Sequence, residues 1–178
     1  STFAANMLQQ AKQNGLQTCV DLGGRRIIKK SQIVAASAPY IDYLVLNETE
    51  AARATGIELQ RDVSAFLRTA SSRLLELGVN KAVIIHMPGV ALWTDVDGNE
   101  LWSNVSKIAE ENIVSPVGAG DAFCSGVLFG IHEGFGPEKT MNLAHAMAAA
   151  NLKVPTANGG IPHIEKLLPT IADHSIAK

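Results

Sequence analysis

The feature of this sequence that most constrains its fold is a regular alternation of helix-like and strand-like segments. Apolar residues at helical spacing are typical of amphipathic helices, and short apolar runs between turn residues are typical of buried strands. Gly15, Gly56 and Gly78 stand where helical patterns should end. Helices are predicted over residues 2–14, 31–38, 48–56 and 62–77, and strands over residues 16–22, 41–47 and 81–87. Such alternation predicts an α/β protein with an open, mostly parallel sheet and helices on both faces.

The second half of the chain adds an antiparallel element to this pattern. In the sequence VALWTDVDGNELWS (residues 90–103), Asp97 and Gly98 lie between two apolar segments, which indicates a β-hairpin with a two-residue turn. An antiparallel pair is therefore expected at one edge of the sheet. Further helical patterns cover residues 119–133 and 137–153. The length of the whole chain, residues 1–178, predicts a single domain.

The composition is that of a folded protein and excludes several kinds of partner. Hydrophobic residues make up 47% and charged residues 18% of the chain, a balance typical of globular domains. The net charge is -2 and no run of Lys or Arg exceeds two residues, so no nucleic acid or membrane partner is expected. No signal peptide pattern is present, and no apolar run approaches the ~20 residues of a membrane helix. Two cysteines are too few for a disulfide framework and favour a reducing, cytoplasmic setting.

One short segment, VSPVGAGDAF (residues 114–123), concentrates glycines at the start of a helical pattern. Gly118 and Gly120 permit backbone conformations that are closed to other residues. The first N–H groups of a helix have no partner within it, so those of residues 118–121 should point outward together. Combined with the positive end of the helix dipole, they predict a cradle for an anion such as phosphate.

Asp121 places a carboxylate in the same turn and admits two interpretations. It can be an ordinary negative charge at a helix N-terminus, where it stabilises the helix by ~0.3–1 kcal/mol. It can also be a general base that removes a proton from a hydroxyl while the cradle stabilises charge on the group under attack. The second combination is that of phosphoryl transfer to an alcohol.

The segment GAGDAFCSG (residues 118–126) is similar to the second signature of the PfkB, or ribokinase-like, family of carbohydrate and nucleoside kinases. It is neither a Walker A loop, which ends in Lys-Ser/Thr, nor a Rossmann fingerprint, because the third glycine is absent. The resemblance implies that Asp121 is the general base and that Gly118, Ala119 and Gly120 form an anion hole with it. It also implies a ribokinase-like three-layer α/β/α fold with an antiparallel hairpin at one edge of its sheet.

A second segment, NETEA (residues 47–51), resembles the NxxE motif of the same family. Taken by themselves, Asn47 and Glu50 are a helix-capping asparagine and a solvated glutamate. The resemblance implies that they organise Mg²⁺ and the phosphates, largely through water. One carboxylate can suffice, because Mg²⁺ keeps several waters and is held by few carboxylates plus substrate phosphates. Ligands of open parallel sheets bind beyond the C-terminal ends of strands, where Asn47, His86 and Gly118 are all expected.

Two further regions are implied to contact the nucleotide. The segment VIIHMPGVALW (residues 83–93) falls where relatives carry a loop along the nucleotide, with His86 and Gly89 as its contacts. His145 aligns with a position beside the adenine in relatives. The alternative for His145 is an ordinary histidine packed on a helix face among alanines.

Two positions depart from the family pattern. The segment VDLGGRR (residues 20–26) falls where relatives often read Asp-Pro-Asn-x-Arg. Ser115 stands where many relatives have an aspartate that helps to hold a monovalent cation near the anion loop. Use of a monovalent cation is therefore left open.

The resemblance implies a kinase that uses ATP and Mg²⁺ to phosphorylate a hydroxyl of a small sugar or nucleoside, with a homodimer as one assembly open to it. Ribose, fructose, other ketoses, sugar acids and nucleosides are all open as acceptors. The chain begins on a helix without an initiator Met, and the di-glycine signature and β lid of relatives are not recognisable in it. We therefore expect the C-terminal, nucleotide-binding portion of such a kinase. The alternative is a nucleotide-binding but catalytically inactive fragment or a structural module.

Overall fold

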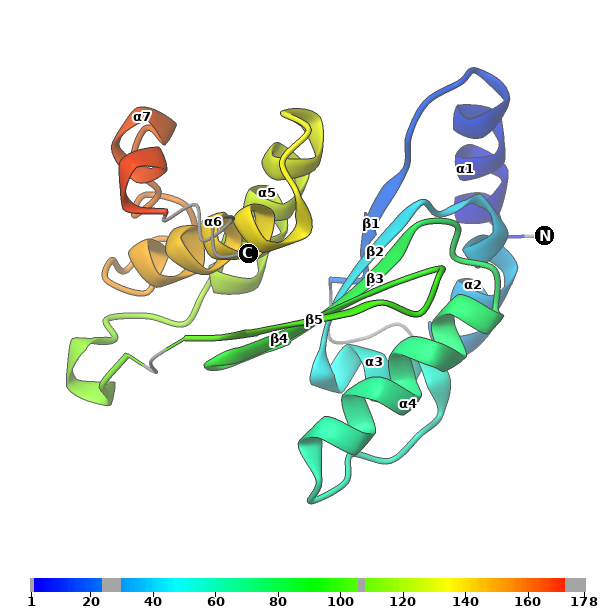
Figure 1. Ribbon diagram of the computed structural model, residues 1–178, viewed down its shortest axis with the longest axis horizontal. Coiled ribbons are helices and arrows are strands. Elements are labelled where there is room, and N and C mark those ends of the chain that lie inside the picture. The colour runs from blue at the N-terminus through cyan, green and yellow to red at the C-terminus, as the bar shows by residue number, and fades with distance from the viewer. Residues whose placement is uncertain (1, 24–29, 106–107, 172–178) are drawn as a thin grey trace, which may run out of the picture. The chain divides into compact units, whose positions relative to one another are not determined.

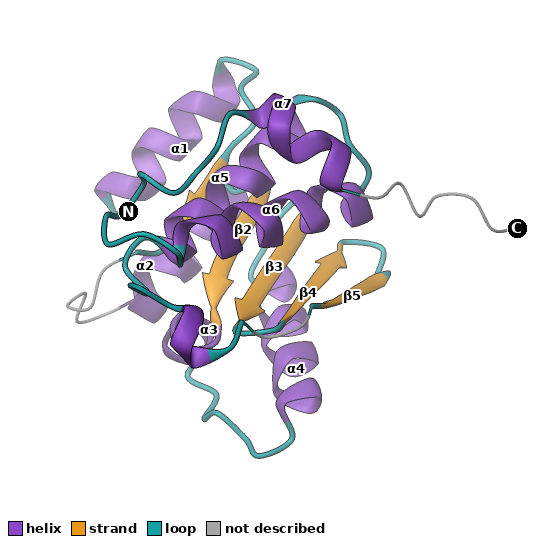
Figure 2. Cartoon of the chain, turned by 90° about the vertical axis from the view of Figure 1, so that its left-hand side faces the viewer, coloured by secondary structure: helices purple, strands orange, loops and turns teal. Residues whose placement is uncertain are grey.

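The computed structural model describes residues 2–23, 30–105 and 108–171 (Figures 1 and 2). The chain divides into two compact units, Ser1–Trp102 and Ser103–Lys178. Each unit has its own helices and is considered by itself below. The prediction of one domain over residues 1–178 stays a prediction.

A five-stranded sheet with the order β1-β2-β3-β4-β5 organises the first unit. Its first three strands, β1 (Cys19–Asp21), β2 (Tyr43–Asn47) and β3 (Ala82–Met87), run parallel. β4 (Val90–Asp95) pairs antiparallel with β3, and β5 (Glu100–Asn104) follows at the edge. The predicted parallel sheet with an antiparallel hairpin at one edge is therefore confirmed.

Four helices of the first unit lie on one face of this sheet, as Figure 1 shows. They are α1 (Phe3–Gln13), α2 (Lys30–Ser37), α3 (Glu48–Thr55) and α4 (Val63–Glu76). Successive strand residues point to opposite faces, so every second residue of β2 and β3 meets these helices. The strand residues of this core are Leu44, Leu46, Val83, Ile85 and Leu92, each of them fully buried.

Two turns shape the antiparallel end of the sheet. β3 and β4 are joined by Pro88 and Gly89 alone, because Met87 pairs directly with Val90. The φ angle of Gly89 is 85°, and proline followed by a left-handed glycine is the sequence pattern of a type II turn. The turn between β4 and β5 is longer than the two residues predicted, since four residues, 96–99, lie between the strands.

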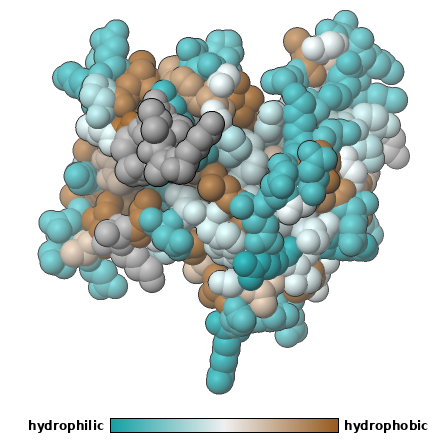
Figure 3. All heavy atoms as spheres, in the orientation of Figure 1, coloured by the Kyte–Doolittle hydropathy of each residue, from teal (hydrophilic) through white to brown (hydrophobic). Residues whose placement is uncertain are grey.

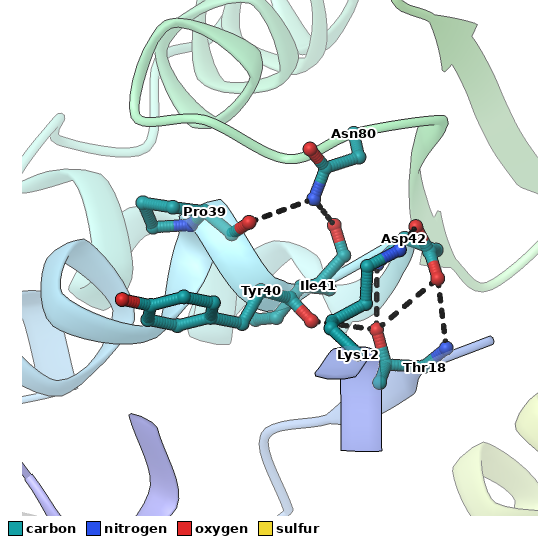
Figure 4. A network of polar contacts seen from close by, with 7 residues as sticks. All are labelled: Lys12, Thr18, Pro39, Tyr40, Ile41, Asp42 and Asn80. Atoms are coloured by element: carbon teal, nitrogen blue, oxygen red, sulfur yellow. Dashed lines mark hydrogen bonds and ion pairs between the residues drawn. The ribbon is translucent and has the colours of Figure 1, made fainter. Parts of the chain in front are cut away.

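The buried carboxylate of Asp42 connects α1 to the beginning of β1 and β2 (Figure 4). Asp42 is 1% exposed and accepts hydrogen bonds from the Thr18 N–H at 2.9 Å and from Lys12 Nζ at 2.6 Å. Burial alone would raise the pKa of Asp42, but the hydrogen bonds from Lys12 and Thr18 outweigh it and hold that pKa below its ordinary value. The carboxylate is therefore charged in the folded protein at neutral pH.

Replacement of Asp42 by asparagine is expected to lower the free energy of unfolding at pH 7 by about 2 kcal/mol, because charge-assisted hydrogen bonds are lost. The depressed pKa contributes stability above the ordinary aspartate pKa, and this contribution is lost as pH falls through the folded-state value. Urea unfolding in steps from pH 7 to pH 2 should show the difference from wild type shrinking below about pH 4. Asp62→Asn is the control, because asparagine caps α4 as well as aspartate does. A difference that stays constant with pH would contradict this role of Asp42.

The second unit is built on two closely packed helices, α5 (Ala119–His132) and α6 (Pro137–Asn151), followed by the short α7 (Ile164–Leu167). A Cβ atom added to Gly126 would lie 2.5 Å from Cα of Ala144, so glycine permits the close approach of the two helices. The core of this unit contains Ala122, Leu143, Met147, Leu167 and Ile171. In the described parts of both units, helices with the length and apolarity needed to cross a membrane are absent.

Some hydrophobic residues lie on the surface and not in either core. Phe3, Leu16 and Val114, for example, are more than half exposed. On the face drawn in Figure 3, hydrophobic atoms appear in small groups among hydrophilic ones. Apolar residues scattered over a surface in this way are normal for a folded protein, so they do not by themselves mark a binding surface.

Candidate active site

The glycine-rich segment forms the N-terminus of α5, as the sequence predicts. Gly118 is the N-cap residue, with φ 80° and ψ 0° in the left-handed region. A Cβ atom at this position would lie 1.9 Å from the carbonyl oxygen of Ala157. Backbone conformation and close approach both require glycine here. The absence of a side chain at Gly118 therefore lets the Ala157 backbone pack directly against the start of α5.

Three of the four predicted amides lack an acceptor in the described parts of the chain. They are the N–H groups of Gly118, Gly120 and Asp121. Ala119 differs from the prediction, because the turn before the helix folds back and its N–H donates to the Pro116 carbonyl oxygen at 3.3 Å. Three unpaired donors at the positive end of a 14-residue helix are well suited to an anion.

Asp121 is the only acidic residue in the first turn of α5, and its side chain is exposed. The Ser125 hydroxyl donates to the backbone carbonyl oxygen of Asp121 at 2.8 Å. This hydrogen bond does not involve the carboxylate of Asp121. A carboxylate so placed interacts favourably with the helix dipole and is also accessible to a bound alcohol. Both interpretations of Asp121 given by the sequence remain compatible with its position.

The predicted position of Gly118 at the end of a strand is wrong. The described residues 108–118 contain a 3-10 turn, Glu110–Asn112, and no strand. Instead the segment lies against the end of α6, where the Leu152 carbonyl oxygen accepts from the Val114 N–H at 2.8 Å. The anion loop is therefore held by helix α6 of its own unit.

Asn47 and His86 do lie at the C-terminal ends of strands, in the first unit. Asn47 is the last residue of β2 and is the direct partner of His86 on β3. The Asn47 side chain accepts from the Glu50 N–H at 2.8 Å, and Glu50 Oε2 accepts from the Asn47 N–H at 3.1 Å. This capping box confirms the helix-capping alternative for Asn47. Glu50, however, is not solvated, because it is only 8% exposed.

The other predicted nucleotide contacts of the first unit are less informative. Gly89 is explained by the turn between β3 and β4, which needs its left-handed conformation. In the segment of residues 20–26, positions 24–26 lie outside the described residues.

Within the described ranges, His, Cys, Asp and Glu side chains form no group of three or more that could hold a metal ion. A metal site that relied on few carboxylates would be compatible with this finding.

His145 lies on α6 in the second unit and packs edge-on against the ring of Phe123, with ring centroids 5.2 Å apart. Burial lowers the pKa of His145 to about 4, so the imidazole is neutral at physiological pH. Its Nε2 atom is buried and has no hydrogen-bond partner in the described part of the structure. The predicted contact residues therefore fall into two groups, one in each unit.

Two residues near the anion loop escaped the sequence prediction. Ala157 approaches Gly118, and the side chain of Asn151 donates to the Val117 carbonyl oxygen at 2.9 Å. Ala157 carries no sequence signal, since an alanine in a loop has no distinguishing chemistry. Asn151 does carry one, because it follows Leu143 and Met147 at helical spacing and is a polar residue on a buried face.

Comparison with known proteins places this arrangement in a family. The model of the pfkB family carbohydrate kinases matches residues 1–164. The 1-phosphofructokinase of Escherichia coli (strain K12) is 34% identical over 103 residues, which are 58% of this chain and 31% of that protein. The 1-phosphofructokinase of Haemophilus influenzae is 30% identical over 102 residues, 57% of this chain and 31% of that protein. The chain thus spans about a third of the curated relatives it matches.

Solved structures agree in fold. The structure of Arabidopsis thaliana ribokinase with ribose and ATP has a TM-score of 0.76 and 23% identity, over 94% of this chain and 51% of that one. Aminoimidazole riboside kinase from Salmonella enterica, solved with its riboside and an ATP analog, has a TM-score of 0.74 and 19% identity, over 94% and 56%. At this identity they establish a ribokinase-like fold. With the match over residues 1–164, they lead to one conclusion: the chain belongs to the pfkB family of carbohydrate kinases.

Proposed function

We propose that this chain takes part in the transfer of the γ-phosphoryl group of ATP to a hydroxyl of a small sugar or nucleoside. The observation that carries the proposal is the N-terminus of α5, where three amides that find no acceptor among the described residues stand beside the exposed carboxylate of Asp121. The family and the fold supply the reaction class. Each role below is assigned to residues within one unit.

The cradle at the N-terminus of α5 would stabilise the charge that develops on the transferred group. Its first donor is the Gly118 N–H, whereas the Ala119 N–H already donates to the Pro116 carbonyl oxygen. Donors fixed by the backbone need no rearrangement when that charge appears, which is why such sites lower a barrier effectively. The N–H groups of Gly120 and Asp121 add two further donors.

Asp121 would accept the proton of the acceptor hydroxyl. A general base must reach the proton that it removes, and the exposed side chain of Asp121 is accessible to an alcohol. With the proton held on the carboxylate, the acceptor oxygen attacks phosphorus while the bond to ADP breaks.

Asn47 and Glu50 would hold hydrated Mg²⁺, which neutralises charge on the nucleotide phosphates when it is bound. The donor set fits this ion, because it consists of oxygen atoms of one carboxylate and one amide. The capping box fixes both side chains at the N-terminus of α3 before any ligand arrives. His86, which pairs with Asn47 in the sheet, would contact the nucleotide, and so would Gly89.

His145 would contact the nucleotide as a neutral imidazole. Because burial lowers the pKa of His145 to about 4, the imidazole carries no charge near neutral pH in the ligand-free protein. The buried Nε2 without a partner in the described residues is available for a hydrogen bond to an uncharged group. Together with the adjacent Phe123 ring, this supports contact with the base and not with the phosphates.

The change Glu50→Gln tests the metal role with little disturbance of the fold. Glutamine can still accept the Asn47 N–H, so the capping box is kept and only the charge is lost. We expect the Mg²⁺ concentration needed for half-maximal activity to rise about 10-fold or more, by analogy with the loss of a metal-orienting group. Titration of activity with Mg²⁺ at saturating ATP measures it. Glu48→Gln, in the same helical turn, is the control and should leave the Mg²⁺ requirement unchanged.

A screen of ADP release over sugars, sugar acids and nucleosides tests the reaction itself. It should be run both on this chain and on the protein made from the intact gene, because the chain spans 51% of the ribokinase with which it aligns. The proposal expects acceptor-dependent ADP release. Binding of ATP–Mg²⁺ by both proteins, with no release for any acceptor, would favour the alternative of an inactive nucleotide-binding module.

A further inference from the structure

Asn151, the last residue of α6, connects this helix to the peptide that enters the anion loop. Its side chain is fully buried, with 0% exposure. Its Nδ2 atom donates a hydrogen bond to the carbonyl oxygen of Val117 at 2.9 Å, across 34 positions of the sequence. Val117 immediately precedes Gly118, so the bond acts on the first peptide unit of the cradle.

This bond determines where the Gly118 N–H points. The carbonyl of Val117 and the N–H of Gly118 belong to one planar peptide unit, in which they point in opposite directions. Because Asn151 holds the carbonyl toward α6, the Gly118 N–H is directed away from that helix. In the described residues this N–H has no acceptor, as the anion cradle requires.

Other contacts of the same region support the loop at the end of α6. The Leu152 carbonyl oxygen accepts from the N–H groups of Val114 and Ser115, at 2.8 and 3.3 Å. The Ala157 backbone occupies the position that a Cβ atom of residue 118 would take. These contacts hold the loop against the end of α6. Among the described residues, however, only Asn151 donates a hydrogen bond to the Val117 carbonyl oxygen.

The second polar atom of Asn151 indicates that the side chain is not retained for stability alone. Its Oδ1 atom is buried and has no hydrogen-bond partner among the described residues. A buried acceptor without a partner is destabilising, and an apolar residue of similar size would remove it. The surrounding face of α6 is apolar, with Met147 and Leu143 one and two turns earlier.

We propose that Asn151 is a positioning residue, which orients the Val117–Gly118 peptide so that its N–H faces the transferred phosphoryl group. The inference rests on the proposed kinase function for its consequence, but the orientation of the peptide can be tested without it. Asn151 touches neither substrate nor reacting atoms. It acts through the backbone of the loop.

The test compares Asn151→Leu with Thr140→Val in the full chain. Thr140 lies on the same helix, about three turns before Asn151, and is equally buried. Its hydroxyl donates to the Phe135 carbonyl oxygen at 3.4 Å. For Asn151→Leu we expect the dissociation constant for ATP–Mg²⁺, measured by calorimetry, to rise about 10-fold, the effect of one lost charge-assisted bond to an anion. Its melting temperature should stay close to that of wild type. Thr140→Val should leave ATP affinity unchanged.

Amide NMR spectra provide the readout that is independent of kinase function. With Asn151→Leu, the N–H signals of Gly118 to Asp121 should shift, and their response to inorganic phosphate should weaken. With Thr140→Val, both should match wild type. If wild type binds no ATP, the proposed function fails, while shifted loop amides would still support the positioning role. Loop signals and ATP affinity in Asn151→Leu equal to those of Thr140→Val would overturn it, as would a loss of affinity explained by unfolding.

Discussion

Asp121→Asn is expected to lower kinase turnover by ~10²–10⁴-fold while ATP–Mg²⁺ affinity stays close to that of wild type. Asparagine keeps the size of the side chain and its position in the first turn of α5, but it cannot accept the proton of the acceptor hydroxyl. Loss of the charge at the helix N-terminus should cost only ~0.3–1 kcal/mol of stability. The fall should therefore appear in kcat in steady-state assays of the catalytically active protein, with thermal unfolding nearly unchanged.

A matched variant separates the two interpretations of Asp121. Glu138→Gln removes the acidic residue in the first turn of α6, so it too removes a carboxylate from a helix N-terminus in the second unit. It should cost similar stability and leave kcat unchanged. If Asp121→Asn and Glu138→Gln had equally small effects on kcat, Asp121 would be only a helix-terminal charge.

Gly118→Ala is expected to have the largest effect on the anion cradle. The new Cβ would lie 1.9 Å from the Ala157 carbonyl oxygen, and the residue would also have to adopt a φ of 80°. Left-handed backbone and overpacking together should lower the free energy of unfolding by about 2–5 kcal/mol. Displacement of the loop should weaken ATP–Mg²⁺ binding by about 10²-fold, measured at a temperature where the variant is folded.

Gly134 offers the control for this change, because it has a φ of 70° and a Cβ atom added there would meet no atom within 4 Å. Gly134→Ala therefore carries the cost of the left-handed backbone, about 1–2 kcal/mol, without the collision. It should leave ATP affinity unaltered. Equal stability and equal ATP affinity of Gly118→Ala and Gly134→Ala would show that the contact with Ala157 does not shape the cradle.

The long helices could be predicted from the sequence because their own residues determine their limits. The pattern over residues 62–77 became α4 (Val63–Glu76), with Asp62 as its cap, and the pattern over 119–133 became α5. β1 was harder to predict. Its apolar run covers residues 16–22, but the strand is Cys19–Asp21, because pairing with residues 43–45 of β2 sets its length and Leu16 remains 60% exposed.

The hairpin between β3 and β4 illustrates a different limit. Pro88-Gly89 is a turn sequence in its own right, and its pattern could have predicted the antiparallel pairing of Met87 with Val90. The family resemblance assigns the same residues to a loop along the nucleotide. The turn between β3 and β4 is by itself enough to explain a glycine at position 89, so this glycine is not evidence of nucleotide binding.

Within the candidate site, the sequence could predict what is local and not what is distant. Gly118, Gly120 and Asp121 are neighbours in one helical turn, so their shared exposure of amides follows from helix geometry. The approach of Ala157 to Gly118 and the bond from Asn151 to Val117 join residues more than 30 positions apart. Contacts of this kind depend on how α6 packs against α5, and periodicity alone does not specify it.

Direct observation of the product by ³¹P NMR tests the central claim, phosphoryl transfer to an alcohol, most directly. The protein would be incubated with ATP, Mg²⁺ and a mixture of sugar and nucleoside acceptors. We predict a phosphate monoester signal on one acceptor that grows in step with ADP and is absent with Asp121→Asn. ADP that accumulates only with free phosphate, or the absence of ADP from a protein that binds ATP–Mg²⁺, would contradict phosphoryl transfer to an alcohol.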